Sequence, residues 1–465
     1  MDMIREHILN LLVEHKQQRV LRCLERLDPC ARESLLREVA ELDFADIAAR
    51  YTTHMTGDEQ AEKIFQEAEL LSPGSAACSS AECDRLRGIG RRALQDGRVA
   101  LYLVAGGQGS RLGFEGPKGC FPVSPLKSKT LFQLFAEQVL ALQQRYGLRV
   151  PWYILTSQEN NRATIDFFTA HSFFGLRPED VRCIVQKQIP SLGLDGQLLV
   201  GKDGLLFKNP NGHGGSLYAL KDSGALTDLS GRGIEEIFYF QVDNPLVTIA
   251  DPLFIGAHID RRAQMSTKVV RKTDPGEKVG IIGRVNGRLG CIEYSELSPE
   301  QTAERAADGT LRFKSANIAV HMLNRAFVEK LVSRSDVHLP WHSAVKDIAC
   351  LECEGGRLVE QRVKGIKSEM FIFDALGFAE RSVTLEVPRA EEFAPVKNAA
   401  GADSPESARA AMLSRARSWL SRALPGREIP DGLQAEISPL FALDARELAE
   451  KINPDIGFAS PLYLG

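Results

Sequence analysis

The sequence lacks the features that mark several large classes of protein. No apolar run in its 465 residues approaches the roughly 20 residues that a membrane-spanning helix needs. The first seven residues already mix charges, which a secretory signal would not do. The net charge of -4 comes without a basic stripe, so nothing favours nucleic acid as a partner. We therefore expect a cytoplasmic protein that binds neither a membrane nor nucleic acid.

Cysteine is present but poorly arranged for a disulfide framework or for zinc. The nine cysteines are odd in number and scattered, a distribution that fits reduced thiols better than a framework of bridges. Cys350 and Cys353 form a C-x-x-C pair with His338 and His342 just upstream, but no second cysteine pair accompanies them. We interpret residues 350–353 as a strand that leads into a Gly-Gly turn, and we expect His342 to pack against the sheet.

Hydrophobic periodicity divides the chain into two kinds of pattern. The first ~70 residues have helical spacing, and Asp28-Pro29 is typical of a helix start. From about residue 96, strands alternate with helices, and Thr130 and Gly147 have the residue types that begin and end a helix. The alternation predicts a largely parallel sheet with helices on both faces. Strands are expected at 99–105, 152–156, 181–186 and 237–242, and a further helix near 159–171.

The second half of the chain contains a weaker set of signals. Asn286-Gly287, between two apolar segments, predicts a β-hairpin. A further helix is expected over 444–451. We divide the chain into a helical N-terminal region (1–95), a nucleotide- and sugar-binding domain (96–390) and a small C-terminal domain (391–465).

The most informative segment is a glycine-rich turn that follows the strand expected at 99–105. It contains Gly106 and Gly107, with cations at Arg111 and Lys118. Glycines let a backbone approach a ligand closely, and nearby fixed charges suit a phosphate chain. The dinucleotide-binding pattern G-x-G-x-x-G fails because Leu112 replaces its third glycine, and the P-loop spacing is absent. The segment therefore predicts phosphate binding outside these two common motifs.

A carboxylate occupies the corresponding position after a second strand. Asp243 directly follows the strand expected at 237–242. The carboxyl ends of parallel strands share one edge of a sheet, where ligands of such folds bind. Mg²⁺ prefers carboxylate and phosphate oxygens. We therefore predict that Asp243 holds Mg²⁺ next to the glycine-rich turn.

The pattern L-x-A-G-G-x-G-[ST]-R-L-G-x-x-x-P-K-G at 103–119 resembles the UTP-dependent sugar-1-phosphate uridylyltransferases, specifically the UDP-N-acetylhexosamine pyrophosphorylase branch. Similar motifs follow in the same order over roughly residues 100–440. The resemblance implies an α/β fold with a Rossmann-like, mixed and mostly parallel sheet of the GT-A-like nucleotidyltransferase kind. It also implies UTP and N-acetylglucosamine-1-phosphate as substrates, Mg²⁺ as cofactor, and UDP-N-acetylglucosamine and pyrophosphate as products.

The resemblance assigns roles residue by residue. Catalytic cations are Arg111, Lys118 and Lys397; the nucleotide is bound by Gly106, Gly107, Gln186 and Gly212; the metal is held by Asp243; and the sugar is bound by His213, Gly280, Glu293, Asn317, Phe371 and Phe373. The oligomeric state is left open, because the C-terminal region is shorter than in eukaryotic relatives.

Other functions stay open at this point. His213 stands where the acetylhexosamine branch usually has asparagine, so a UDP-glucose or broad UDP-sugar pyrophosphorylase is an alternative. A non-catalytic nucleotide-sugar sensor is a more remote alternative, and such a protein would be expected to lose Lys118, Asp243 or Lys397, which are all present. An NAD-dependent enzyme is disfavoured by Leu112.

Overall fold

Two compact units make up the computed structural model, which describes residues 2–56, 63–75, 78–294, 296–334 and 338–465. One unit combines Met1–Lys63, Gln186–Ser216 and Leu339–Ile372, and the larger one combines Ile64–Val185, Leu217–His338 and Phe373–Gly465. Each unit is assembled from three separate segments of the sequence. The three domains expected from the sequence stay a prediction.

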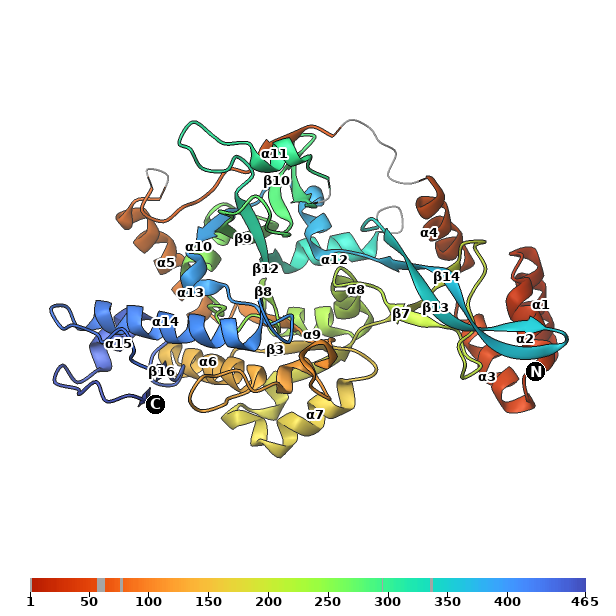
Figure 1. Cartoon of the computed structure of the whole chain (residues 1–465), viewed down its shortest axis with the longest axis horizontal. Helices are drawn as coiled ribbons and strands as arrows, with labels where there is room; N and C mark the ends of the chain where they lie inside the picture. The colour runs from red at the N-terminus through yellow and green to blue at the C-terminus, as the bar shows by residue number, and fades with distance from the viewer. Residues whose placement is uncertain (1, 57–62, 76–77, 295, 335–337) are drawn as a thin grey trace. The chain divides into compact units, whose positions relative to one another are not determined.

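The larger unit is built on a mixed sheet with a parallel centre (Figure 1). Among the described residues its ten strands are β1 (Phe65–Glu67), β2 (Val99–Val104), β3 (Trp152–Thr156), β4 (Val181–Val185), β8 (Glu236–Gln241), β9 (Met265–Arg271), β10 (Ile281–Val285), β11 (Arg288–Ile292), β12 (Ser315–Asn324) and β15 (Thr384–Val387). Strands β4, β3, β2 and β8 run parallel to one another in that order. Beyond them, β12 runs antiparallel to β8 and β9, and β15 runs parallel to β9. The predicted fold class is confirmed.

Continuous apolar sequence explains the parallel centre of the sheet. Strand β2 has the sequence VALYLV, and Leu101, Tyr102 and Leu103 are fully buried. Strands covered on both faces bury every side chain, so they lack the alternation of a half-exposed strand. The surrounding helices are α5 (Ser80–Gln95), α6 (Leu131–Tyr146), α7 (Asn161–Ala170), α9 (Ala225–Gly231), α10 (Pro252–Asp260) and α12 (Arg325–Ser333).

Local signals fix the ends of these elements where the sequence predicted them. The side chain of Thr130 accepts a hydrogen bond from the N–H of Gln133 at the start of α6, and Gly147 ends that helix in the left-handed conformation. Asn286 and Gly287 both have positive φ between β10 and β11, as a two-residue hairpin turn of type I′ requires. These predictions are confirmed.

The C-terminal segment packs into the same core. It contains α13 (Arg389–Glu392), α14 (Pro405–Ala423), α15 (Ala445–Lys451) and the short parallel pair β16 (Ala435–Ile437) and β17 (Leu462–Leu464). Val396, Ala408 and Met412 belong to the core cluster that surrounds the sheet. Residues 389–412 are therefore part of the support for the sheet.

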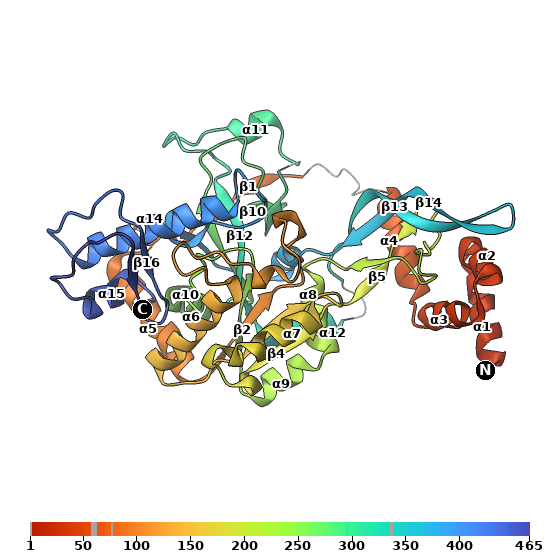
Figure 2. The ribbon, with the colours of Figure 1, turned by 60° about the horizontal axis from the view of Figure 1, so that its bottom comes forward.

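The smaller unit joins helices to a long hairpin (Figure 2). Its helices are α1 (Asp2–Glu14), α2 (Gln18–Arg26), α3 (Pro29–Ala40) and α4 (Phe44–Thr56), and its strands are β5 (Gln188–Pro190), β6 (Leu192–Gly193), β7 (Lys208–Pro210), β13 (His342–Glu354) and β14 (Arg357–Glu369). The Asp28 side chain accepts from the N–H groups of Cys30 and Ala31 at the start of α3, as predicted. The strand interpretation of residues 350–353 is also confirmed, since they lie in β13.

One expectation about cysteine is wrong. Cys78 and Cys83 form a disulfide, with their Cα atoms 5.8 Å apart, so the thiols are not all reduced. The bridge joins cysteines five positions apart and closes a local loop. The number and spread of the cysteines along the chain do not reveal such a local bridge. Within the described residues, no helix combines the length and the apolar character needed to cross a bilayer.

Candidate active site

The first glycine-rich loop begins directly after β2 and folds back on itself. The N–H of Gly109 donates to the carbonyl of Gly116 (2.9 Å), and the N–H of Lys118 donates to the carbonyl of Gly107 (3.1 Å). A Cβ atom at Gly109 would lie 2.7 Å from the ring of Phe114, so this closure requires glycine. The fold-back returns Lys118 to the start of the loop.

The side chain of Asn160 binds the start of this loop. Its side-chain amide donates to the carbonyls of Ala105 (2.9 Å) and Gly107 (3.3 Å), and its carbonyl oxygen accepts from the N–H of Ser157 (2.8 Å). Asn160 is fully buried, whereas Gly107 is exposed. The loop is thus held at its start while Gly107 stays accessible to a ligand.

Four charged side chains meet beside this loop. Burial lowers the pKa of the Lys118 amine, the Asp243 carboxylate raises it, and the positive charges of Lys397 and Arg111 lower it further. Such mutual effects require the four groups to be near neighbours. The structure therefore places Arg111, Lys397 and Asp243 near Lys118, and Lys397 also pairs with Asp403 at 3.4 Å.

Lys397 reaches this cluster because the chain before it is tied to the end of β8. The N–H of Val396 donates to the carbonyl of Asp243 (2.8 Å). The buried side chain of Asn244 donates to the carbonyl of Glu392 (2.7 Å) and accepts from the N–H of Ala394 (3.1 Å). Asn244 thus positions the segment that carries Lys397.

The donor set around Asp243 suits one kind of metal site. Among the described residues, no group of three or more His, Cys, Asp or Glu could hold a metal ion, so the protein offers no complete cage there. Mg²⁺ is usually held by one or two carboxylates together with substrate phosphates. Asp243 is half-buried beside three cations that suit phosphate, and it fits that arrangement.

Predicted sugar-binding residues converge elsewhere in the larger unit. The N–H of Asn317 donates to the carbonyl of Gly280 (2.9 Å), and the Asn317 amide lies 3.9 Å from the Cys291 sulfur. A Cβ atom at Gly280 would lie 2.5 Å from that sulfur and 3.8 Å from an Oε atom of Glu293. Burial raises the pKa of the Cys291 thiol well above its usual value, and Glu293 and Asp374 raise it further. The cluster therefore contains a neutral thiol among polar groups.

In the smaller unit, the second glycine-rich loop is fixed by Gln186. Its side-chain amide donates to the Asn211 side chain (2.9 Å) and to the Gly212 carbonyl (2.6 Å). Gly212 has a φ of +82°, and a Cβ atom there would lie 2.4 Å from the carbonyl oxygen of Met370. Only glycine fits this position. Gln186, which we predict to bind the nucleotide, thus donates from its amide nitrogen to the loop, and its amide oxygen is an acceptor.

His213 follows in the same loop with a defined ring orientation. Its Nδ1 accepts from the N–H of Ile372 (3.0 Å), so the ring proton resides on Nε2. Burial, with a smaller contribution from nearby His342, lowers the pKa of His213 to about 4. The ring stacks on Phe371 with centroids 5.2 Å apart. Near neutral pH, His213 is therefore an uncharged imidazole whose Nε2–H is a donor.

Comparisons with known proteins identify the family. The family described as UTP–glucose-1-phosphate uridylyltransferase matches residues 44–419 of this chain. The chain belongs to this family. It is also 37% identical to a human protein named UDP-N-acetylhexosamine pyrophosphorylase-like protein 1, over 96% of this chain and 94% of that protein.

Two further proteins with similarity to this uridylyltransferase chain are named as UDP-N-acetylglucosamine pyrophosphorylases. The UDP-N-acetylglucosamine pyrophosphorylase of Saccharomyces cerevisiae is 36% identical over 78% of this chain and 77% of its own. A crystal structure of the Trypanosoma brucei UDP-N-acetylglucosamine pyrophosphorylase has a TM-score of 0.82 at 27% identity, over 96% of this chain and 94% of that one. These findings confirm the resemblance and the nucleotidyltransferase class, and they support the predicted formation of UDP-N-acetylglucosamine.

Some uridylyltransferase residues were misread or missed in the sequence. The expectation that His342 packs against the large sheet is wrong: it begins β13, and its ring stacks on Phe371 at 4.2 Å. Phe371 belongs to the smaller unit and Phe373 to the larger, so their predicted role in binding the sugar stays a prediction. Asn160 and Cys291 belong to no motif in the sequence. Their positions beside the glycine-rich loop and beside Asn317 follow only from their contacts in the structure.

Proposed function

We propose that this chain transfers the uridylyl group of UTP to N-acetylglucosamine-1-phosphate, forming UDP-N-acetylglucosamine and pyrophosphate. The observation that carries the proposal is the cluster of Arg111, Lys118 and Lys397 near Asp243, beside the glycine-rich loop. Three cations match the charge of a triphosphate. The relatives named above supply the uridine and the acetylated sugar as the substrates to test first.

The reaction needs positioning and charge neutralisation more than proton transfer. A phosphate oxygen of the sugar phosphate, already ionised near neutral pH, forms a bond to the α-phosphorus of UTP. The bond from that phosphorus to the oxygen between the α- and β-phosphates breaks, and this oxygen leaves with pyrophosphate. Negative charge moves onto the departing pyrophosphate. Lys118 and Arg111 are placed to hold the triphosphate, and Lys397 adds a third charge from the C-terminal segment.

Magnesium is part of this proposal. Bound Mg²⁺ would neutralise charge on the phosphates, and Asp243 is the residue that we propose to hold it. Asp243 also favours the charged form of Lys118, so its carboxylate supports the cluster even before substrates bind. We assign no other protein ligand to the ion.

The sugar is assigned to Gly280, Glu293 and Asn317 in the larger unit. These residues are polar or small and meet around Cys291, which is a neutral thiol and therefore adds no charge near a neutral sugar. Glu293 and Asn317 are suited to hydroxyl groups, because carboxylate and amide oxygens accept from O–H donors.

UDP-glucose formation is the second candidate. His213 favours it, since this position usually holds asparagine in the acetylhexosamine branch. The imidazole is neutral with a donating Nε2–H, which suits a sugar hydroxyl as well as an acetyl carbonyl. The cytoplasmic location expected from the sequence stays a prediction.

A substrate panel tests the proposal. Purified protein with Mg²⁺ is given each of four nucleoside triphosphates and, in turn, the 1-phosphates of N-acetylglucosamine, N-acetylgalactosamine, glucose and galactose. Pyrophosphate release is expected with UTP and N-acetylglucosamine-1-phosphate, and it should disappear when either substrate is left out. Release from another nucleotide in preference to UTP would contradict the proposal.

A further inference from the structure

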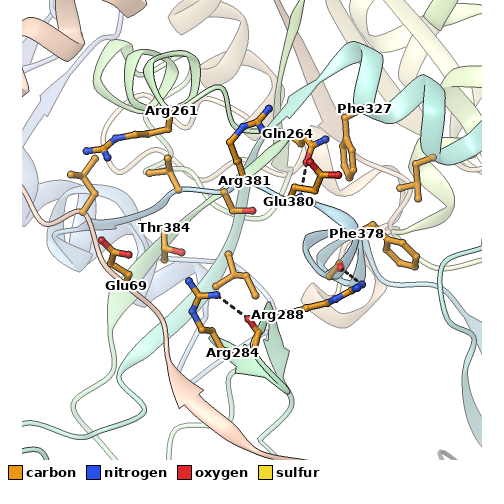
Figure 3. Close-up of a pocket in the computed structure, with 18 of the residues that line it drawn as sticks. Glu69, Arg261, Gln264, Arg284, Arg288, Phe327, Phe378, Glu380, Arg381 and Thr384 are labelled. Atoms are coloured by element: carbon orange, nitrogen blue, oxygen red, sulfur yellow. Dashed lines mark hydrogen bonds between the residues drawn. The ribbon is translucent and has the colours of Figure 1, made fainter.

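A cavity in the larger unit is lined by none of the residues assigned to UTP or sugar. Its volume is about 760 Å³, within the range of roughly 300–1,000 Å³ typical of small-molecule sites. Its walls come from residues 69–71, the β10–β11 hairpin, α12 and residues 377–384 (Figure 3). Along β10, the hairpin turn lies six residues from Gly280, which corresponds to roughly 20 Å of strand.

The cavity is basic although the chain is acidic overall. The net charge of the chain is -4. Two carboxylates, Glu69 and Glu380, line the cavity together with six basic side chains, which are Arg261, Arg284, Arg288, Lys330, Arg334 and Arg381. A local excess of positive charge in a concave site attracts anions.

Main-chain carbonyls hold three of these arginines in place. Arg284 donates to the carbonyl of Gly287 (2.9 Å), Arg288 to that of Gly377 (3.3 Å), and Arg381 to another carbonyl at 2.8 Å. Within the described parts of the chain, no ion pair connects any of the three to a carboxylate. Since a guanidinium has five N–H donors, each arginine is oriented and keeps donors for a ligand.

The remaining walls add apolar surface. Phe378, which lies near Arg288 in Figure 3, contributes apolar surface, and Leu289 also lines the cavity. The cavity therefore suits a compact anion attached to a small organic body.

We propose that this cavity binds a small organic phosphate, separately from the predicted reaction centre. Arginine forks match phosphate oxygens in geometry as well as in charge. The hydrogen bond from Arg288 to Gly377 joins the hairpin to η5 (Ile372–Phe378), and these two elements lead to Gly280 and Phe373. A ligand that ties the hairpin to this segment therefore changes the KM for the sugar phosphate more than the KM for UTP.

Calorimetric titration tests the site without relying on catalysis. Glucose 6-phosphate and inorganic phosphate serve as probes, with saturating UDP present to fill the nucleotide site. We expect saturable binding of glucose 6-phosphate at one site per chain. Arg284→Gln together with Arg288→Gln should weaken binding at least about tenfold through the loss of charge-assisted contacts, with kcat unchanged without the probe.

Two further variants guard against misfolding and against general charge effects. Glu69→Gln removes a carboxylate from the wall and should tighten binding, which a damaged fold would not do. Arg162→Gln is the matched control. The Arg162 side chain is 87% exposed on α7, so its replacement should leave binding unchanged.

Absence of saturable binding, or equal weakening by the control, would overturn the proposal. Binding of a polyglutamate peptide in place of glucose 6-phosphate would assign the cavity to a protein partner and would also overturn it. An unchanged KM for the sugar phosphate with the probe bound would refute the coupling.

Discussion

Replacing Lys118 with methionine removes one positive charge and keeps a side chain of similar length. The main-chain hydrogen bond from Lys118 to Gly107 is unaffected, so the glycine-rich loop should keep its shape. The neighbours of Lys118 are two cations and Asp243. Its loss therefore removes one of the three positive charges of a cluster that also contains Asp243 and, paired with Lys397 at 3.4 Å, Asp403. The change should affect the step in which pyrophosphate departs.

The size of the effect follows from the surroundings of Lys118. At an effective dielectric constant of about 20, a charge pair 4 Å apart is worth about 4 kcal/mol. Measured losses of one contact to a developing charge are about 2.7–4 kcal/mol, which corresponds to roughly 10²–10³-fold in kcat. Lys118 is half-buried, so screening by water removes only part of this energy. We expect a fall in kcat of that order.

Steady-state pyrophosphate release measures kcat and KM separately for parent and variant. The KM for the sugar phosphate should change much less than kcat. Lys127→Met is the control, because Lys127 is exposed and its ammonium lies over the Tyr463 ring, 4.6 Å from the centroid. A folded Lys118→Met variant with the kcat of the parent would refute the reasoning and remove Lys118 from the catalytic set.

Three further predictions concern the neighbours of Lys118 and the sugar. Asp243→Asn should abolish Mg²⁺-dependent turnover while thermal unfolding stays near that of the parent; a parental response to Mg²⁺ would make Asp243 structural. The same variant removes the group that raises the pKa of Lys118, so the amine should lose its proton at lower pH, and Lys397→Met should shift this titration upward. The pH dependence of Lys118 acetylation by acetic anhydride, followed by mass spectrometry, measures both shifts, and opposite signs would contradict the arrangement. His213→Asn should raise the preference for N-acetylglucosamine-1-phosphate over glucose-1-phosphate in kcat/KM, whereas a preference unchanged in His213→Asn would exclude this position from sugar choice.

Local signals made much of the fold predictable. The limits of α6 depend on a hydroxyl at Thr130 and on glycine at Gly147, and both act on neighbouring backbone groups. The parallel strands could be predicted because a strand that is buried on both faces needs a continuous apolar sequence, as in β2. In each case the cause lies within a few residues of the effect.

Contacts between distant segments could not be predicted in the same way. The smaller unit combines pieces separated by more than a hundred residues, and no periodicity records which pieces meet. Cys291 lies beside Asn317 and Gly280 only because β10, β11 and β12 adjoin. His342 lies at the start of β13, and the Phe371 ring on which it stacks follows the end of β14.

The cation cluster was predictable for a different reason. Arg111, Lys118 and Asp243 follow two strands that end at one edge of the sheet, whereas Lys397 was assigned only through a motif that resembles a known family. Such a motif carries spatial information that the local pattern lacks. The structure adds the physical link, a hydrogen bond from Val396 to the carbonyl of Asp243 that places Lys397. The roles of these residues stay predictions until the variants are measured.

The central claim is that the chain makes UDP-N-acetylglucosamine in preference to UDP-glucose. The most direct measurement is kcat/KM of the parent protein for N-acetylglucosamine-1-phosphate and for glucose-1-phosphate, at saturating UTP and Mg²⁺, with the nucleotide sugar identified by mass. One methyl-sized contact discriminates by only about 1–3 kcal/mol, so glucose-1-phosphate should remain a poor but measurable substrate. A higher value for N-acetylglucosamine-1-phosphate is predicted. A preference for glucose-1-phosphate of about tenfold, or about 1.4 kcal/mol, would contradict the account.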